Sequence, residues 1–117
     1  KTPANVYAGL DNGHIYKSID SGGLWNPATS DPAPHPVKAL VINQSIPTKL
    51  FAATYGGGVY KSINSGVDWS ACNGPANRNV ISLVTNSTGG LYAGTEAGVF
   101  VSTNDCSSWA EMNAGLP

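Results

Sequence analysis

The sequence predicts an all-β fold in which a unit of about 40 residues recurs. An eight-residue motif, Ser18–Trp25, returns as Ser62–Trp69 and again, with more substitutions, as Ser102–Trp109. The tryptophans that close these motifs stand 44 and then 40 residues apart, which is the period of one four-stranded propeller blade. Runs of β-branched and aromatic residues alternate with Gly, Asn, Asp and Ser, as short strands joined by tight turns require. We therefore expect a segment of a β-propeller with about three blades of antiparallel strands.

Two strands of each blade are predicted by hairpin signals that precede the motif. The first strands are Val6–Leu10, Leu50–Thr54 and Leu91–Thr95. After a turn rich in Gly and Asn, the second strands are Ile15–Ser18, Val59–Ser62 and Val99–Ser102. The β-enrichment of these runs and the turn residues between them are typical of hairpins.

Two further apolar runs, Val37–Ile42 and Val80–Val84, are predicted to form the innermost strands of the second and third blades. The segment that follows each Trp supplies the outermost strand. Blade 1, at about 1–34, then lacks an innermost strand, whereas blade 2 spans about 35–78 and blade 3 about 79–117. Asn113–Pro117 stops where the next innermost strand is expected to begin. Because an unpaired edge favours pairing with another segment, we expect the missing strand to come from further sequence or a neighbouring copy.

Length and charge limit the partners of this chain. A closed propeller needs roughly 160 to 350 residues and this chain has 117, so we expect the rest of a longer propeller chain or further copies as partners. Charged residues make up 11% of the sequence and the net charge is -1, which offers no basic surface to nucleic acid. No apolar run approaches the roughly 18 residues of a spanning helix, so membrane insertion is not expected.

The repeated motif has the pattern Ser-X-Asp-X-Gly-X-X-Trp and resembles the Asp-box of bacterial neuraminidase repeats. This resemblance implies propellers such as those of sialidases, oligoxyloglucan-type glycoside hydrolases, sortilin-like receptors and photosystem assembly proteins. The matching positions are Ser18, Asp20, Gly22 and Trp25, then Ser62, Asn64, Gly66 and Trp69, and finally Ser102, Asn104 and Trp109, with Cys106 at the glycine position.

We interpret the motif as a structural turn rather than a catalytic or calcium-binding site. The Asp or Asn oxygen can accept backbone N–H bonds, Gly permits a left-handed residue, and Trp is expected to anchor the outermost strand in the sheet packing. Catalysis would not recur at the same place in every blade, and Asn replaces Asp twice.

Catalytic groups are sparse. The family resemblance implies that a sialidase-like site would contain a cluster of three arginines and a Tyr nucleophile. Arg78 is the only arginine of this chain, so a complete site of that kind is excluded within these residues. A general glycosidase needs two carboxylates roughly 5 to 9.5 Å apart. Asp20, Asp68 and Asp105 belong to motif turns, which leaves Asp11 and Glu96, at equivalent hairpin turns, as the notable acids.

The hairpin turns and the loops 27–36 and 71–79 are expected to emerge on one face of the propeller, opposite the motif turns. Such a face often binds ligands, and its side chains suit a sugar or a peptide, although exposed turn residues are the plainer interpretation. The ligand-binding candidates are Asp11, Asn12, His14, His35, Tyr55, Arg78 and Glu96. The histidines lack metal-ligand spacing, and neither a metal nor another cofactor is expected.

The cysteines and the N-glycosylation sequons give information on the cellular location of the protein. Cys72 and Cys106 permit one disulfide between blades 2 and 3, which suits a secreted protein, while two free thiols are equally consistent with the sequence. Asn43 and Asn86 begin N-glycosylation sequons in equivalent loops, and turn chemistry explains them as well. A secreted, extracellular or periplasmic location is expected.

Three functions fit these observations. The leading hypothesis is a non-catalytic propeller module that serves as a scaffold or as a recognition surface for glycan or protein. The alternatives are a fragment of a carbohydrate-active glycoside hydrolase and a self-assembling subunit that pairs through its open blade edge.

Overall fold

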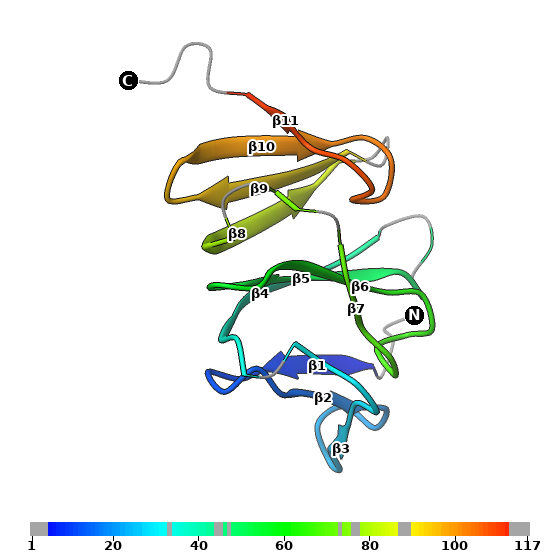
Figure 1. The fold of residues 1–117 in the computed structure, drawn as a ribbon. Helices are drawn as coiled ribbons and strands as arrows, with labels where there is room; N and C mark the ends of the chain where they lie inside the picture. Colours follow the sequence, from blue (N-terminus) through cyan, green and yellow to red (C-terminus); the bar gives the residue numbers. More distant parts are fainter. Residues whose placement is uncertain are drawn as a thin grey trace.

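The computed structural model describes residues 5–32, 34–43, 46, 48–72, 74–75, 78–86 and 90–112. In these ranges the regular elements are eleven strands in one three-stranded and two four-stranded antiparallel sheets. Figure 1 shows the sheets stacked face to face, with the middle sheet between the other two. The predicted all-β fold of propeller blades is confirmed.

Each sheet follows the chain order from its inner to its outer strand. Blade 1 contains β1 (Val6–Gly9), β2 (Ile15–Ser18) and β3 (Asn26–Pro27). Blade 2 contains β4 (Val37–Ile42), β5 (Leu50–Thr54), β6 (Gly58–Ser62) and β7 (Ser70–Ala71). Blade 3 contains β8 (Val80–Thr85), β9 (Leu91–Thr95), β10 (Gly98–Ser102) and β11 (Ala110–Glu111). Within the described residues, blade 1 has no counterpart of β4 and β8, as the sequence predicts.

The strand registers repeat from blade to blade. Val6 pairs with Ser18 in blade 1, and Leu50 pairs with Ser62 in blade 2. Both inner strands carry a register shift at the same place, after Val37 in β4 and after Val80 in β8. Residues at equivalent positions can therefore be compared directly between blades.

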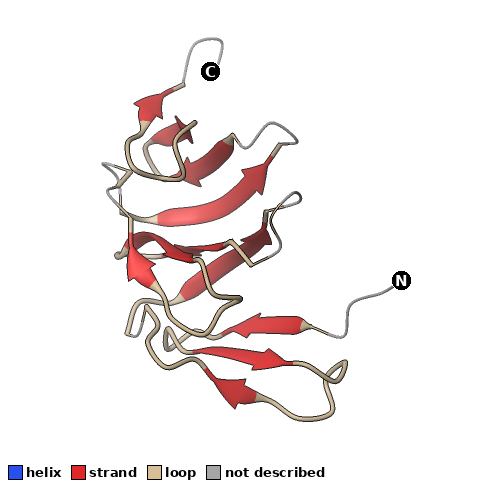
Figure 2. Ribbon diagram, turned by 90° about the vertical axis from the view of Figure 1, so that its right-hand side faces the viewer, coloured by secondary structure: helices blue, strands red, loops and turns tan. Residues whose placement is uncertain are grey.

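The core lies at the two junctions between blades, which Figure 2 shows from the side. All five residues of β5 are buried. Since successive side chains of a strand point to opposite faces of the sheet, both faces must be covered at this strand. Leu50 and Ala52 belong to the cluster shared with blade 1, whereas Phe51 and Ala53 belong to the cluster shared with blade 3. Blade 2 is thus packed on both faces.

Small residues allow the close packing of blades 1 and 2. A Cβ at Gly9 would lie 2.4 Å from Val37 Cγ1, so glycine is required where β1 meets the start of β4. Gly9 in the first hairpin strand therefore lets blades 1 and 2 approach closely.

The expectation that each motif Trp anchors the outermost strand is wrong for Trp25. Its side chain is 38% exposed, compared with 5% for Trp69. The motif turn of blade 2 packs on blade 1, where Ser30 Oγ accepts a hydrogen bond from the backbone N–H of Trp69 at 3.1 Å. Among the described residues, no sheet lies on the corresponding side of blade 1, and Trp25 is left partly exposed there.

Candidate functional site

The motif turns share one hydrogen-bond network. In blade 1, Ser18 Oγ donates to Asp20 Oδ1 at 2.8 Å and accepts the Gly22 N–H at 2.8 Å. Asp20 Oδ1 also accepts the Leu24 N–H at 2.8 Å. An amide oxygen can accept the same bonds, which explains why Asn occupies this position in blades 2 and 3.

Blades 2 and 3 repeat this network with Asn64 and Asn104, whose Oδ1 atoms each accept the equivalent N–H at 3.0 Å. The motif serines are fully buried, and their hydroxyls accept the N–H at the glycine position in all three blades. The sequence pattern predicted the roles of the Asp or Asn and of the Gly, but not this role of the Ser. Its presence in all three motifs was the available signal.

Two consecutive left-handed residues close each motif turn. The first has φ of 61° at Ser21, 62° at Ser65 and 59° at Asp105. The second has φ of 98° at Gly22 and 84° at Gly66, but it is Cys106 in blade 3, with φ of 63°. The sequence predicted only the second of these positions, because a glycine indicates a left-handed conformation and a serine or aspartate does not.

Hydrogen bonds hold the pKa of the Asp20 carboxyl below its ordinary value. The backbone N–H of Leu24 makes the largest contribution, followed by the Ser18 hydroxyl, because both bonds favour the charged form. This carboxylate is committed to the turn, which supports a structural role for it.

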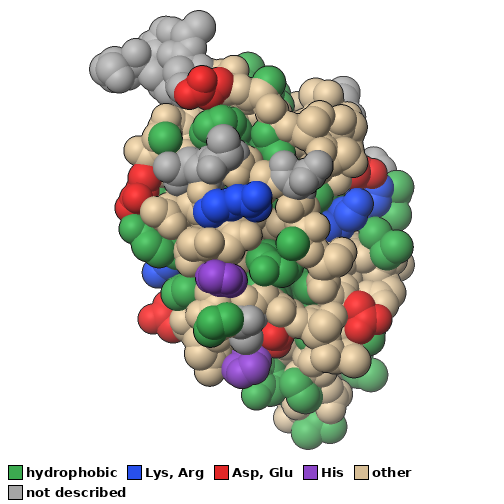
Figure 3. All heavy atoms as spheres, viewed as in Figure 1, with side chains coloured by type: hydrophobic (Ala, Val, Ile, Leu, Met, Phe, Trp, Pro, Cys, Tyr) green, Lys and Arg blue, Asp and Glu red, His purple; other side chains and the backbone are tan. Residues whose placement is uncertain are grey.

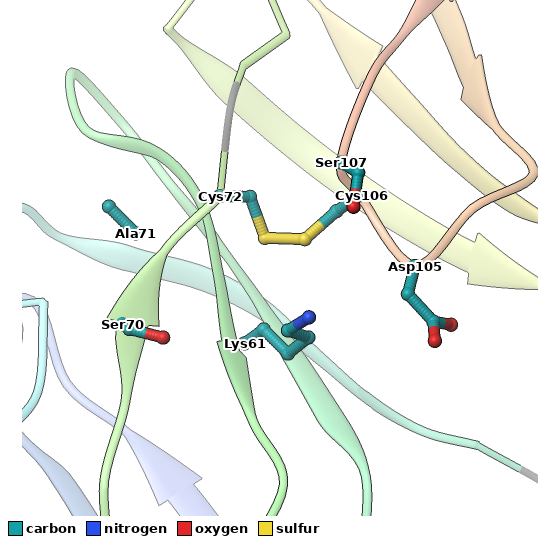
Figure 4. A pocket seen from close by; sticks show the side chains of 7 residues that line it. All are labelled: Lys61, Ser70, Ala71, Cys72, Asp105, Cys106 and Ser107. Atoms are coloured by element: carbon teal, nitrogen blue, oxygen red, sulfur yellow. A yellow bond between two sulfur atoms is a disulfide. The ribbon is translucent and has the colours of Figure 1, made fainter.

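A disulfide joins Cys72, the residue after β7, to Cys106 in the motif turn of blade 3, with the two Cα atoms 5.6 Å apart (Figure 4). The Lys49 ammonium pairs with the Asp105 carboxylate at 2.6 Å in the same turn. A groove of about 280 Å³ lies beside the disulfide, slightly below the roughly 300 to 1,000 Å³ of ordinary ligand sites. Blade 3 is therefore fastened to blade 2 by a covalent bond and an ion pair.

On the hairpin-turn face, the structure brings Tyr55 and Glu96 together across the junction of blades 2 and 3. The Tyr55 hydroxyl donates to Glu96 Oε2 at 2.5 Å, and Asn79 Nδ2 donates to Glu96 Oε1 at 2.9 Å. These two donors hold the pKa of Glu96 below its ordinary value. The hydrogen bond to Glu96 and its negative charge raise the pKa of Tyr55. Asn79 is not among the candidates predicted from the sequence, because no sequence signal distinguishes it from other loop asparagines.

His35 and Arg78 lie over the glycine turn that follows Tyr55. A Cβ at Gly57 would lie 2.7 Å from His35 Cδ2, and one at Gly58 would lie 3.0 Å from Arg78 Nη1. The run of glycines therefore makes room for both side chains. Four of the seven predicted ligand-binding residues, Tyr55, Glu96, His35 and Arg78, surround this turn, and we call them with Asn79 the turn-face cluster.

The remaining three candidates belong to blade 1 and make separate contacts. His14 Nδ1 lies 3.1 Å from Asp31 Oδ2, Asn12 Oδ1 accepts the His14 N–H at 3.1 Å, and Asp11 Oδ1 lies 3.8 Å from Lys38 Nζ. Figure 3 shows both histidine side chains of the chain at the surface of one face. The partners Asp31 and Lys38 were not selected from the sequence.

The side chains of the sequon asparagines, Asn43 and Asn86, accept backbone hydrogen bonds within their own loops. Asn43 Oδ1 accepts the Ile46 N–H at 2.9 Å, and Asn86 Oδ1 accepts the Gly90 N–H at 2.7 Å. The other residues of both sequons, and the predicted end of the repeat at 113–117, lie outside the described residues.

Within the described ranges, no group of three His, Cys, Asp or Glu side chains gathers into a metal site. The same residues include no helix long and apolar enough to cross a membrane.

Comparison with solved structures identifies the fold as that of a β-propeller. An ancestral GH74 enzyme is similar over 94% of this chain, with a TM-score of 0.74 and 23% identity. The GH74 xyloglucanase from Xanthomonas campestris is similar over 97% of it, with a TM-score of 0.74 and 17% identity. YCF48 bound to a D1 peptide is similar over 92%, with a TM-score of 0.76 and 12% identity. The chain spans only 16%, 22% and 36% of these proteins, respectively. No protein-family model and no curated protein matches the sequence.

Proposed function

We propose that this chain is a segment of an Asp-box propeller whose hairpin-turn face recognises a glycan or a protein without catalysing a reaction. The observation that carries the proposal is the turn-face cluster, in which aromatic, carboxylate, amide, imidazole and guanidinium groups from blades 2 and 3 meet around one glycine turn. Such a mixture of hydrogen-bonding groups suits a polar ligand. The Ser–Asp or Ser–Asn network of the three motif turns supports the Asp-box assignment.

The electrostatics of Glu96 argue against a role as the general acid of a glycosidase. A glycosidase general acid needs a raised pKa so that it holds its proton near neutral pH. The pKa of Glu96 is lowered instead, because Tyr55 and Asn79 both donate to it. Asp11 is paired with Lys38, and Asp20 is committed to a motif turn. Asp20 and Glu96 therefore both act as hydrogen-bond acceptors within the fold.

A hydrolase segment is the second candidate, and the likeness to two GH74 enzymes favours it. In that case Asp11 or Glu96 would work with acids supplied by other parts of a longer chain. The disulfide between Cys72 and Cys106 supports a secreted, extracellular or periplasmic setting under either function.

The deciding experiment measures binding and turnover on the same panel of neutral and acidic glycans and of peptides. We expect binding without turnover. Glu96→Gln, which removes the negative charge, and Tyr55→Phe, which removes a hydroxyl, should each weaken binding about tenfold or more, since a hydrogen bond to a charged group is worth roughly 1.4 kcal/mol or more. Asp68→Asn is the matched control, because this exposed acid lies in a motif turn away from the cluster. Turnover that Glu96→Gln abolishes would establish the hydrolase, and binding that is equal in all variants would exclude the turn-face cluster as the site.

A further inference from the structure

The bridged junction between blades 2 and 3 has an unbridged counterpart between blades 1 and 2. Cys72 and Ala28 hold equivalent places, because the backbone N–H of each donates to the second hairpin strand of its own blade, at 2.8 and 2.9 Å. Cys106 corresponds to Gly66, at the second left-handed position of the motif turn. Blades 1 and 2 pack together without a covalent bond at this place. A junction of this kind therefore does not require one.

The two bridged cysteines differ in their exposure. Cys106 is 2% exposed and belongs to the core cluster between blades 2 and 3. Cys72 is only partly buried and packs against the edge of that cluster. The groove of about 280 Å³ is lined by both residues (Figure 4). We therefore expect a small molecule that enters this groove to reach Cys72 more readily than Cys106.

A cation lines the same groove. Lys61 of β6 is one of its lining residues, and Figure 4 shows the Lys61 side chain with the bridge in this groove. Among the described residues, the ion pairs do not include Lys61. Asp105 also lines the groove, but its carboxylate is paired with the Lys49 ammonium at 2.6 Å. The groove therefore keeps a positive charge, which favours a thiolate over a thiol.

We propose that this bridge is a thiol-exchange site, at which a small thiol becomes linked to Cys72 while Lys61 stabilises the departing Cys106 thiolate. The thiolate of the small molecule attacks Cys72 Sγ, and the bond between the two cysteine sulfurs breaks with its electron pair passing to Cys106 Sγ. Cys106 then takes up the proton that the small thiol released. One disulfide replaces another, so the step needs no oxidant or reductant.

The exchange is reversible because Cys106 stays close to Cys72. The Ser102 hydroxyl accepts the backbone N–H of Cys106 at 2.9 Å, which fixes the turn independently of the bridge. The Cys106 thiolate can then attack Cys72 Sγ, expel the small thiol and restore the bridge. The exchange changes the covalent state of the junction while the blades remain packed, and it is independent of ligand binding on the turn-face cluster.

Mercaptoethanol provides the direct test on the oxidised full chain. It is uncharged, so Lys61 cannot act by attracting an anionic reagent. After an acid quench, unfolding and alkylation of free thiols, peptide mass mapping locates the adduct, and we expect about tenfold more of it on Cys72 than on Cys106. Lys61→Gln should slow adduct formation about threefold or more, because a nearby lysine lowers the pKa of a departing thiol. Lys17→Gln is the matched control, since Lys17 lines the equivalent groove at the unbridged junction.

Single-cysteine variants test the accessibility of each sulfur separately. Cys106→Gly and Cys72→Ala introduce the residues found at the unbridged junction, so both are expected to fold. Without denaturant, Cys72 in the first variant should react with hydroxyethyl disulfide about tenfold faster than Cys106 in the second.

Four results would each overturn the proposal. They are an adduct mainly on Cys106, an adduct that forms only in denaturant, equal rates for Lys61→Gln and the native chain, and a native chain in which both cysteines are free thiols.

Discussion

The junction of blades 2 and 3 allows a quantitative test through its disulfide. The perturbation is the double variant Cys72→Ala, Cys106→Gly, which removes the bridge and restores the glycine that the first two motifs carry at this position. The bridge closes a segment with a sequence separation of 34. For a loop of this length, the loss of unfolded-state entropy corresponds to a stabilisation of about 3.8 kcal/mol.

Glycine at residue 106 offsets part of this loss. Cys106 has φ of 63°, and a residue with a Cβ is disfavoured in that conformation by about 1 kcal/mol relative to glycine. The net decrease in the free energy of unfolding is therefore about 2.8 kcal/mol. For a chain of 117 residues, this decrease lowers the melting temperature by about 11 °C.

Thermal unfolding followed by circular dichroism without reductant measures the difference. The variant Cys72→Ala, Cys106→Ala is the matched control, because it removes the same bridge but keeps a Cβ at the left-handed position. We expect it to melt about 4 °C below the glycine variant. Intact mass before and after reduction and alkylation establishes whether the wild-type chain contains the bridge.

Two results would refute this reasoning. If reduction is not needed before both cysteines of the native chain can be alkylated, the disulfide does not form. If the glycine variant melts within about 2 °C of an oxidised wild-type chain, the bridge forms without constraining the unfolded state as calculated.

Three further predictions concern single side chains. Trp69→Ala is expected to lower the free energy of unfolding by about 3 to 5 kcal/mol, and Trp25→Ala by less than about 2 kcal/mol. The reason is that Trp69 is 5% exposed and Trp25 is 38% exposed. Equal losses of unfolding free energy in urea titrations would contradict this argument. Stability should fall as the pH drops from about 5 to about 3, because the pKa of Asp20 is lower in the folded chain than its ordinary 3.8. The Asp20 carboxylate stabilises the fold fully at pH values above its pKa in the unfolded chain, and this contribution is lost as the pH falls through its pKa in the folded chain. Asp20→Asn should therefore flatten the dependence of stability on pH. An unchanged slope would count against the turn network. The pKa of Tyr55 lies above its ordinary 10.0 because of Glu96, so Glu96→Gln should lower it in an absorbance titration, whereas an unchanged titration would mean that the two side chains do not interact.

Much of the strand pattern could be predicted from the sequence, because each strand and turn depends on residues close together in the chain. The strands Ile15–Ser18, Val37–Ile42 and Leu50–Thr54 were predicted to the residue. The strands β6 and β10 begin one residue earlier than predicted, at Gly58 and Gly98. At these positions the glycine continues the ladder after the turn.

The candidate site was predicted less completely, because its members come from different blades. Tyr55 and Glu96 were selected separately, as turn residues, and their hydrogen bond spans 41 residues of sequence. Asn79 was missed for the same reason: its role depends on the position of Glu96. The grouping of blade 1 candidates apart from the turn-face cluster likewise follows from which blades are in contact.

The sequence by itself determined the blade period, the order of the strands, the motif turns and the absence of an inner strand in blade 1 within the described chain, since these features follow from local patterns that recur. Only the tertiary structure decided that Cys72 is bonded to Cys106, that Trp69 is buried while Trp25 is exposed, and that a groove lies beside the disulfide. The physical reason is that each of these facts depends on the packing of one blade against the next.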